Sequence, residues 1–564
     1  MRIAQTALIV LSLAIVTLPA RAALVISTDA TAHVSCTQGQ YARVCNATAA
    51  NAVLNVTKLS NLLAAQNVNV ATGSATDDIV INAPLSWTSA SGLALIAQRS
   101  IVVNAHVSDA GTGTELNLEM GSGGHLSFGP QGNIGFFDTS SLLVINNQGY
   151  QLVNSVPGLA TWVGNNAAGY YALAASYDAT PDGTYAHAPI QPIFSGIFEG
   201  LGNTVSSLTI DDTTAGDNVG LFAYISGGTV ENVRLTKASV QATGNSSAFS
   251  TVGGLVGINR GTLFGDSVAG RVTGSYAYAG GLAGGQGPGF TSHASAAVTV
   301  KLTGGGNAGG LIGYQVNGSA SVDHSHASGK VTGGDGMNVG GLIGSNTEPV
   351  ETSYATGDAS GGVNAYVGGL VGINWGGSIK KSYATGSATT GASSGNLRST
   401  AGGLVGELDS STISQSWAAG AVTAAGTDGG GLTGASFGAI DNSYATGSVT
   451  SGSDAGGLAG YNASTISAAY STGAPQGASG ITGGLLGGDG AQAGSLTHTY
   501  WDTTTSGITD PAQGSGYPAS DPGIAPKTTS QLRAGLPAGF KPGIWGEKST
   551  VNNGLPYLLA IPPG

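Results

Sequence analysis

Two short motifs resemble catalytic or cofactor-binding sequences. Residues 391–395, Gly-Ala-Ser-Ser-Gly, match the nucleophile elbow of serine hydrolases, where a turn between a strand and a helix exposes the serine hydroxyl. No helical pattern follows this polar loop, so we do not expect a hydrolase. Residues 304–309, Gly-Gly-Gly-Asn-Ala-Gly, match a dinucleotide-binding glycine pattern, but they open a β-type repeat instead of a helix. A simple turn is the expected structure there.

Histidines and paired carboxylates are the other residues that could do chemistry. His324 and His326 are spaced to share one face of a strand, as a metal pair would be. No third ligand is evident, so structural or surface histidines are favoured. The acidic pairs at 77–78 and 211–212 could belong to a polysaccharide-degrading enzyme, or they could lie at coil edges and turns. We therefore expect no catalytic residue, no metal site and no cofactor.

The N-terminus has the pattern of an export signal. A basic start at Arg2 precedes an apolar run over 7–18, and Ala20-Arg21-Ala22 supplies small residues for cleavage before Ala23. The apolar run is too short to span a bilayer of about 30 Å. These features predict a signal peptide over residues 1–22 and a protein that is exported.

Cys36 and Cys45 are the only cysteines of the chain. In an exported protein a disulfide between them is favoured. Two free thiols and a metal-binding pair are the alternatives, although the spacing fits no zinc pattern. A disulfide here would close a short loop near the mature N-terminus, where a repetitive fold needs a cap.

The composition is unlike that of an ordinary globular domain. Glycine accounts for 96 of 564 residues, and charged residues for only 9%, against about 25% in typical domains. The net charge of −12 and the absence of a basic patch exclude nucleic acid as an expected partner. No segment after the signal is apolar for long enough to form a membrane helix. Ala, Val, Leu, Ser, Thr and Gly are typical of strands joined by tight turns.

A repeat of about 30 residues dominates the sequence from residue 216 onward. A step of the form Gly-Gly-Leu-(Val/Ile/Ala/Leu)-Gly recurs, and neighbouring leucines are 26 to 34 residues apart. Such a period indicates a solenoid, and a propeller blade normally needs about 40 residues or more. One repeat cannot bury enough apolar surface to fold alone, so we expect stacked coils. The repeat leucines are Leu221, Leu255, Leu282, Leu311, Leu342, Leu370, Leu404, Leu432, Leu458 and Leu485.

Two columns of side chains should follow from this stacking. A Ser-aromatic-Ala-(Thr/Ser)-Gly motif follows several leucine steps, as in Ser353-Tyr354-Ala355-Thr356-Gly357, and its aromatic residues should stack face to face. Asparagines four residues past a repeat leucine should form a second ladder. The predicted aromatic positions are His293, His326, Tyr354, Tyr383, Trp417, Tyr444, Tyr470 and Tyr500. The predicted asparagine positions are Asn259, Asn346, Asn374 and Asn462.

These repeats resemble a known family. Residues 368–374, Gly-Gly-Leu-Val-Gly-Ile-Asn, and their copies resemble the GLUG motif, and residues 194–210 resemble the segment that commonly precedes such repeats. Residues 77–104 and 142–153 resemble filamentous-haemagglutinin-type solenoid sequence. The resemblance implies an exported bacterial adhesin or surface-structure protein. Its usual Asn-Pro-Asn secretion motif is missing between Ala23 and Trp87.

The predicted fold is an all-β parallel β-solenoid, a β-helix rod with short irregular caps. We divide the chain into a signal peptide (1–22), an N-terminal cap with the cysteine pair (23–55) and haemagglutinin-like coils (56–155). A bridging segment (156–215), the GLUG array (216–499) and a C-terminal cap or tail (500–564) follow. A short helix is expected over 59–66.

The predicted function is surface adhesion or cell-surface structure without catalysis. A host-cell, matrix or glycan surface is the expected partner, together with an outer-membrane secretion partner. The expected location is extracellular or at the cell surface, with the periplasm as an alternative. A carbohydrate-active β-helix enzyme and a passive structural spacer are the competing hypotheses.

Overall fold

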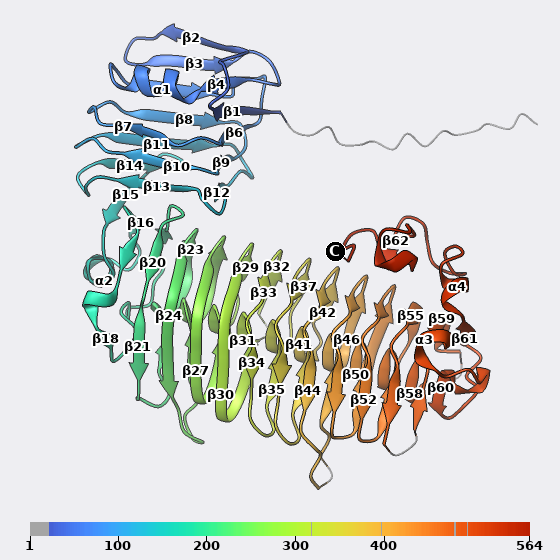
Figure 1. Cartoon of the computed structure of the whole chain (residues 1–564). Coiled ribbons are helices and arrows are strands. Elements are labelled where there is room, and N and C mark those ends of the chain that lie inside the picture. Colours follow the sequence, from blue (N-terminus) through green and yellow to red (C-terminus); the bar gives the residue numbers. More distant parts are fainter. Residues whose placement is uncertain (1–21, 317, 396, 479–480, 493, 564) are drawn as a thin grey trace, which may run out of the picture. The chain divides into compact units, whose positions relative to one another are not determined.

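The computed structural model describes residues 22–316, 318–395, 397–478, 481–492 and 494–563. The predicted signal peptide lies outside the described residues except for Ala22. The described chain is almost entirely β-structure, and it divides into two compact units, one ending at Gly149 and the other beginning at Tyr150 (Figure 1). Parallel pairing dominates both units, which confirms the predicted β-solenoid.

The first unit is a three-sided solenoid. Its strands alternate buried and exposed side chains, as in Leu93–Ala97, so each coil places one row of apolar residues inside. One sheet has the order β2–β3–β5–β8–β11–β14, the second β4–β1–β6–β9–β12 and the third β7–β10–β13. The strands are β1 (Ala23–Ser27), β2 (Val34–Gln38), β3 (Arg43–Ala47), β4 (Val53–Asn55), β5 (Val68–Ala71), β6 (Asp78–Ile81), β7 (Leu85–Trp87), β8 (Leu93–Ala97), β9 (Ile101–Val103), β10 (His106–Asp109), β11 (Glu115–Met120), β12 (Leu126–Phe128), β13 (Asn133–Phe136) and β14 (Leu142–Ile145).

A disulfide-linked hairpin and a helix close the start of the first unit. Cys36 and Cys45 lie directly opposite each other in the antiparallel β2–β3 pair and form a disulfide. Helix α1 (Val56–Leu63) begins where the Asn55 side chain accepts a hydrogen bond from the Lys58 amide, and it packs against β7. The predicted helix is therefore present, although it begins and ends three residues earlier than expected.

The second unit begins with a helix that packs onto its core. Helix α2 (Val156–Asn165) starts at Ser155, whose hydroxyl accepts from the Gly158 amide, and it buries Val156, Leu159 and Val163. The segment 156–215, predicted as a bridge, already forms strands that pair with the later coils. Strand β15 (Gln148–Val153) precedes α2, and the elements that follow α2 in this segment are β16 (Tyr170–Leu173), β17 (Tyr177–Asp178), η1 (Thr180–Asp182), β18 (Thr184–Tyr185), β19 (Ile197–Glu199), β20 (Thr204–Ser206) and β21 (Thr209–Asp212).

Most coils of the repeat array have a short strand before the leucine step, and every coil has a strand after it. Before Leu282 and Leu311, the end of a long strand takes the place of the short one. The strands before the step are β22 (Asn218–Val219), β25 (Ser250–Gly253), β35 (Asn338–Gly340), β40 (Tyr366–Gly368), β45 (Thr400–Gly402), β49 (Asp428–Gly430), β53 (Asp454–Gly456) and β57 (Thr482–Gly483). The strands after it are β23 (Phe222–Glu231), β26 (Val256–Phe264), β28 (Ala283–Gln286), β31 (Ile312–Gln315), β36 (Ile343–Asn346), β41 (Val371–Trp375), β46 (Val405–Ser414), β50 (Thr433–Asp441), β54 (Ala459–Asn462) and β58 (Leu486–Asp489).

The remainder of each coil consists of further short strands or, in the early coils, of one long strand. The long strands are β24 (Arg234–Thr243), β27 (Ser267–Gly280) and β30 (Ser295–Gly309). The short ones are β29 (Phe290–Ser292), β32 (Ser321–Asp323), β33 (His326–Ala327), β34 (Val331–Thr332), β37 (Val350–Glu351), β38 (Tyr354–Ala355), β39 (Ala359–Ser360), β42 (Ser378–Lys380), β43 (Tyr383–Ala384), β44 (Ala388–Thr390), β47 (Trp417–Ala418), β48 (Val422–Ala424), β51 (Tyr444–Ala445), β52 (Val449–Ser451), β55 (Ile466–Ser471), β56 (Pro475–Gly477) and β59 (Leu496–Asp502).

The repeat leucines form the centre of the core. All ten are completely buried, and each amide from Leu255 to Leu458 donates to the carbonyl of the next leucine, as Leu370 does to Leu404 at 2.8 Å. A glycine is required before each leucine because an atom of the neighbouring coil approaches its Cα closely. A Cβ atom on Gly369 would lie 2.1 Å from the Gly403 carbonyl oxygen of the next coil. The Gly-Gly-Leu step therefore brings neighbouring backbones together over a leucine column.

A corner of left-handed backbone recurs in every coil and was not predicted. The corner residue lies between a strand and the Ser-aromatic-Ala motif of the same coil. Its φ lies between 45° and 67°, and in most coils it is not glycine. Left-handed backbone is unfavourable for most L-residues, and the neighbouring coils hold it in place here. The corner residues are Asn232, Gly265, His293, His324, Thr352, Lys381, Gln415, Asn442, Ala468 and His498.

The C-terminal segment closes the last coil and then returns along the side of the array. Trp501 is fully buried in the core, and its indole nitrogen donates to the Ile508 carbonyl. The segment after it is drawn in red in Figure 1. Its elements are α3 (Thr503–Ser506), η2 (Pro511–Gly514), β60 (Ser515–Tyr517), β61 (Ile524–Lys527), α4 (Thr529–Leu532), β62 (Trp545–Gly546), η3 (Asn552–Gly554) and β63 (Tyr557–Leu558).

Candidate functional site

From His326 to Tyr470, the aromatic residues of the repeat form one continuous stack on the outside of the coils, and Tyr500 follows in register. In each short strand the alanine points inward and is buried, so the preceding aromatic residue points outward. From His326 to Trp417, ring centroids lie 4.6 to 4.8 Å apart with planes within 5° of parallel. We call the set His326, Tyr354, Tyr383, Trp417, Tyr444, Tyr470 and Tyr500 the aromatic column.

A serine ladder beneath the column fixes its register. The Ser382 amide donates to the Ser416 hydroxyl oxygen of the next coil at 3.2 Å, and the Ser382 hydroxyl donates to the Lys380 carbonyl. Ser325, Ser353 and Ser416 repeat both interactions. These serines are completely or almost completely buried, so their hydroxyls satisfy backbone groups that would otherwise lack partners. This explains the serine of the motif, to which sequence analysis assigned no role.

The C-terminal segment covers the later part of the aromatic column. The Trp417 indole nitrogen donates to the Ile561 carbonyl at 3.0 Å, and the Tyr470 hydroxyl donates to the Pro556 carbonyl at 2.6 Å. Trp545 packs against two rings of the column, with centroid distances of 5.9 and 6.0 Å. His326, Tyr354 and Tyr383 remain half-buried, and burial lowers the pKa of His326. Each of these rings covers the faces of its neighbours in the stack. This part of the column therefore offers ring edges and polar groups to a partner.

The structure corrects one position of the predicted column. His293 occupies a left-handed corner instead of an aromatic slot, because Ser295 is the residue in register with His326. The ring of His293 stacks on His324, with centroids 4.9 Å apart. His324 also approaches the Asp323 carboxylate at 2.7 Å. The two histidines considered as a metal pair, His324 and His326, therefore belong to different ring stacks.

The predicted asparagine ladder is in register but interrupted. The Asn346 amide donates to the Asn374 side-chain oxygen at 2.6 Å, and the Asn259 amide donates to Gln286 at 3.4 Å. Leu408 and Ser436 follow Asn374 in this column and interrupt the ladder, which resumes where the Asn462 amide donates to Asp489 at 3.4 Å. These amides are buried and bind backbone carbonyls at the turn, as Asn374 does with Gly377. Their role is to support the fold.

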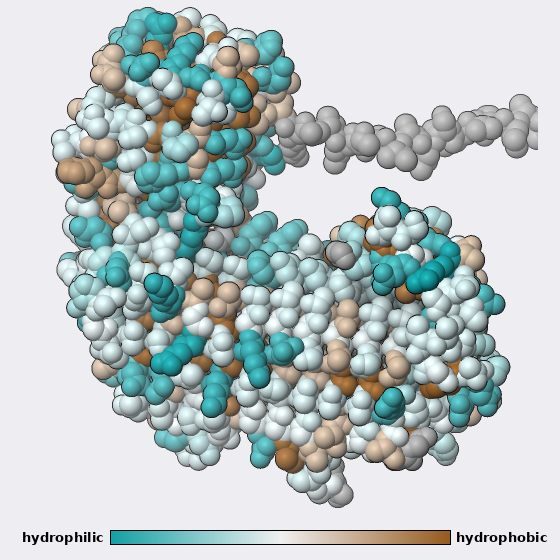
Figure 2. All heavy atoms as spheres, viewed as in Figure 1, coloured by the Kyte–Doolittle hydropathy of each residue, from teal (hydrophilic) through white to brown (hydrophobic). Residues whose placement is uncertain are grey.

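A ladder of hydroxyl side chains lies on a separate row of the coils. Each member follows an inward alanine or valine, and the last three side chains are exposed. We define the threonine ladder as Thr332, Ser360, Thr389, Thr423 and Thr450, which are in register on five successive coils. Figure 2 shows that much of the visible face of the second unit is pale, which is the colour of residues that are neither strongly hydrophilic nor hydrophobic.

One cluster concentrates charges in a chain that has few. The Arg398 guanidinium lies 5.1 Å from the Tyr461 ring centroid and 3.5 Å from the Asp428 carboxylate. Burial raises the pKa of Glu407 to about 7 and the pKa of Asp428 to about 6, while Arg398 opposes both increases. Trp375 is half-exposed in the row next to Glu407. This set has no signal in the sequence, because its members come from different coils at irregular positions.

A second group of acids lies in the early coils of the second unit. Glu199 and Glu231 are in register on neighbouring coils, and burial followed by mutual repulsion raises the pKa of Glu199 well above its usual value. Burial also raises the pKa of Glu231 to about 7. Glu199 accepts hydrogen bonds from the Leu201 amide and the Asn232 side chain. Glu199 is buried in the core, whereas the Glu231 side chain is partly exposed at the end of β23.

The other motifs that the sequence suggested as sites lie in a strand, in a loop and in pairs of interacting side chains. Residues 304–309 lie at the end of strand β30, and 391–395 lie in a loop without the helix that a nucleophile elbow requires. Asp78 forms a paired interaction with the Arg99 guanidinium, and Asp211 accepts from the Gln241 amide. Asp212 is buried beside His187.

Comparisons with known proteins support the repeat assignment. The family model of the GLUG motif matches residues 304–332 and 363–389. No curated protein matches this chain. A crystal structure described as that of a candidate immunoglobulin A1 protease from Bacteroides ovatus aligns at 15% identity with a TM-score of 0.23, covering 73% of this chain and 93% of that chain. The chain is thus a β-solenoid that contains GLUG motifs.

The helices of the described part of the chain are short. None of its helices is both long and apolar enough to cross a bilayer.

Proposed function

We propose that this protein is exported and acts in adhesion or as a structural element at the cell surface, without catalysis. The signal-like N-terminus and the resemblance to filamentous-haemagglutinin-type solenoids support export to the surface through an outer-membrane secretion partner. The GLUG-motif solenoid supports a repetitive extracellular role. The proposed partner is a host-cell, matrix or glycan surface.

The repetition of the same outward side chains on successive coils carries this proposal. The threonine ladder presents hydroxyl groups at the coil spacing of about 4.8 Å, on a backbone held rigid by parallel pairing. A regular row of this kind can bind a partner that is itself repetitive, because each coil adds one equivalent contact. A compact enzyme site, in contrast, needs a few unique residues in one place.

The chemistry of the ladder favours a neutral partner. Thr389, Thr423 and Thr450 carry hydroxyl groups that both donate and accept hydrogen bonds. The ladder itself carries no charge, so binding should depend weakly on salt. Glycan hydroxyls and protein backbone groups are the partner groups that fit this surface.

Lysine substitution of the ladder tests the proposal. Purified protein should adhere to an immobilised glycan, matrix or abiotic surface, and changing three exposed members of the ladder to lysine should reduce adherence at least tenfold. A control variant carries three lysines at exposed positions outside the ladder and should adhere normally. The test positions are Thr389, Thr423 and Thr450, and the control positions are Gln40, Ser140 and Thr161.

The result can also contradict the proposal. Unchanged adherence of the ladder variant, with an unchanged melting temperature, would show that the ladder is not the binding surface. If the unmodified protein adheres to no surface, and deletion of two coils changes only its length, the passive-spacer hypothesis is correct.

The cluster around Arg398 favours a second candidate function, a carbohydrate-active enzyme. Glu407 and Asp428 are carboxyl groups with raised pKa values, as a general acid of a glycosidase requires. The half-exposed Trp375 lies in the neighbouring row. Release of reducing sugars from a panel of polysaccharides, lost in Glu407→Gln, would support this function. The control is Glu351→Gln, since Glu351 only forms surface ion pairs with lysines.

A further inference from the structure

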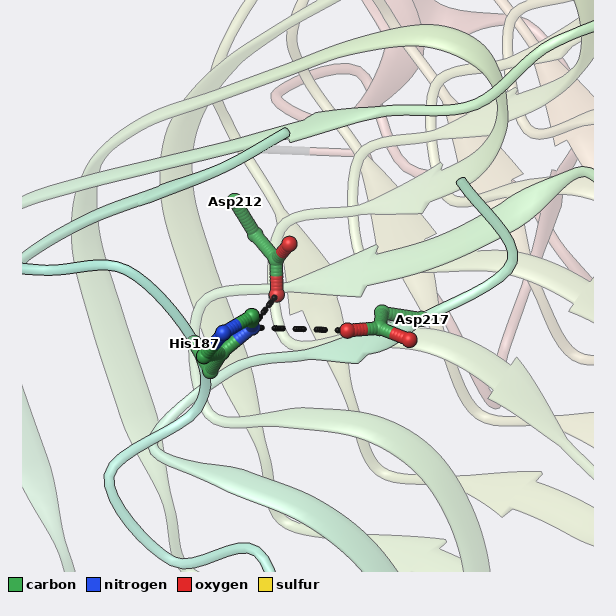
Figure 3. Close-up of side chains that lie close together, drawn as sticks. All are labelled: His187, Asp212 and Asp217. Atoms are coloured by element: carbon green, nitrogen blue, oxygen red, sulfur yellow. Dashed lines mark hydrogen bonds and ion pairs between the residues drawn. The ribbon is translucent and has the colours of Figure 1, made fainter. Parts of the chain in front are cut away.

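Three potential metal ligands meet at the start of the second unit. His187 follows strand β18, Asp212 ends strand β21, and Asp217 precedes strand β22. Pairing of β18 with β21 brings the first two segments side by side. Figure 3 shows the imidazole of His187 with both carboxylates pointing toward it. The sequence pattern singled out Asp212 only as a pair with Asp211, and nothing in the sequence connects either residue with His187.

The distances between these groups match the first coordination sphere of a metal ion. His187 Nδ1 lies 3.1 Å from an Asp212 carboxylate oxygen and 3.4 Å from an Asp217 carboxylate oxygen. All three ligand atoms lie within 4.8 Å of one another. Metal–ligand bonds of about 2.0–2.1 Å in tetrahedral geometry place ligand atoms about 3.3 Å apart. The two separations from His187 Nδ1 therefore fit such a site without adjustment, and the two carboxylates need to lie about 3.3 Å apart when the ion is bound.

The hydrogen bonding leaves one of the two carboxylates poorly satisfied. Asp212 is buried; one of its oxygens accepts from the Thr214 amide, and the other faces His187. The Asp217 carboxylate has no hydrogen-bond donor among the residues that the structure describes, apart from the shared imidazole. One N–H group cannot serve two carboxylates well, and a buried carboxylate needs a compensating charge.

The site opens into a hollow of about 400 Å³ in the surface of the second unit. Gln191 and Asn218 also line this hollow, and they supply further oxygen atoms near the cluster. There is thus room for an ion together with water or a small ligand. His187 and Asp217 are each about half-exposed, so an ion can enter without unfolding of the coil.

We propose that His187, Asp212 and Asp217 bind a first-row divalent transition metal ion, with Zn²⁺ as the representative. One imidazole and two carboxylates form a mixed nitrogen–oxygen set, which suits Zn²⁺ and Mn²⁺. Ca²⁺ and Mg²⁺ prefer sets made of oxygen alone. The ion joins three segments of the first coils, and its remaining coordination positions face the hollow.

Metal titration of the untagged protein tests this site. After treatment with a chelator, the protein should bind one equivalent of Zn²⁺ in isothermal titration calorimetry, and its melting temperature should increase with Zn²⁺ more than with Ca²⁺. The variants His187→Gln and Asp217→Asn should each weaken binding at least tenfold, since these half-exposed residues can be changed without disturbing the core. Co²⁺ should give a visible absorption band that both variants lack.

A matched control uses the neighbouring acid. Asp211→Asn should bind Zn²⁺ normally, because Asp211 lies next to Asp212 in β21 but points to the opposite side and contacts Gln241. Equal Zn²⁺ binding by all four proteins would assign the metal to other histidines and refute the site. Absence of stoichiometric Zn²⁺ and Mn²⁺ binding by the unmodified protein would also refute it.

Discussion

Replacing Gly403 by alanine should weaken the stack at a single coil. A Cβ atom on Gly403 would lie 2.1 Å from the Gly431 carbonyl oxygen, whereas such atoms essentially never approach below 3.0 Å. The neighbouring coils must therefore separate by about 1 Å at this point. Gly403 does not have positive φ, so the conflict is steric and not conformational. Overpacking costs about 1–3 kcal/mol, and we expect the upper end because the obstacle is backbone.

The effect should be local, because each coil contacts mainly its neighbours. Hydrogen exchange followed by mass spectrometry should show faster exchange in peptides that contain Leu404 and Leu432, whose backbone groups bond across this contact. Coils of the first unit should exchange at the wild-type rate. The melting temperature of the second unit should also decrease.

A second glycine supplies the control. Gly164 lies in α2 with no atom within 4 Å of its Cβ position, so alanine there should leave the protein equally stable or up to about 1 kcal/mol more stable. If Gly403→Ala shows the same melting temperature and the same exchange as wild type, the coils do not depend on the glycine contact. The explanation of the Gly-Gly-Leu step would then be wrong.

Four further changes have expected outcomes. Leu404→Asp places an unpaired charge in the fully buried leucine column and should destabilise the second unit by several kcal/mol in thermal melting. Thr352→Gly removes a β-branched residue from a left-handed corner and should raise stability by about 0.5–1 kcal/mol in denaturant unfolding. Glu199 and Glu231 bind protons more tightly when folded, so the free energy of unfolding should fall as pH rises from about 4.5 to about 7, and Glu231→Gln should flatten this slope. Trp545→Ala should loosen the C-terminal segment from the aromatic column, detected as faster proteolysis after residue 530 without unfolding of the coils.

The sequence alone determined the type of fold. Because every coil must bury the same surface against the next, the chain repeats the same residues at the same spacing, and this repetition is visible without coordinates. The leucine column and the stacked rings from Tyr354 to Tyr470 follow directly from that rule. The disulfide between Cys36 and Cys45 followed from the export context and the cysteine count.

The left-handed corners and the C-terminal cover were decided by tertiary structure. His293 was assigned to the wrong column because a corner filled by His, Thr, Lys, Gln or Ala has no local signal, in contrast to one filled by glycine. The return of Trp545 and Ile561 onto the aromatic column depends on contacts between residues more than 70 positions apart. No local pattern specifies contacts over that distance.

The candidate metal site also has no local pattern in the sequence. His187, Asp212 and Asp217 are separated by 25 and 5 residues and match no ligand spacing, so they are unremarkable in the sequence. They meet because β18 and β21 occupy the same position on successive coils and because the loop before β22 returns to them. Residues that have the same role in every coil recur at the same spacing, so they can be recognised in the sequence. A site made from residues that differ between coils exists only once the coils are stacked.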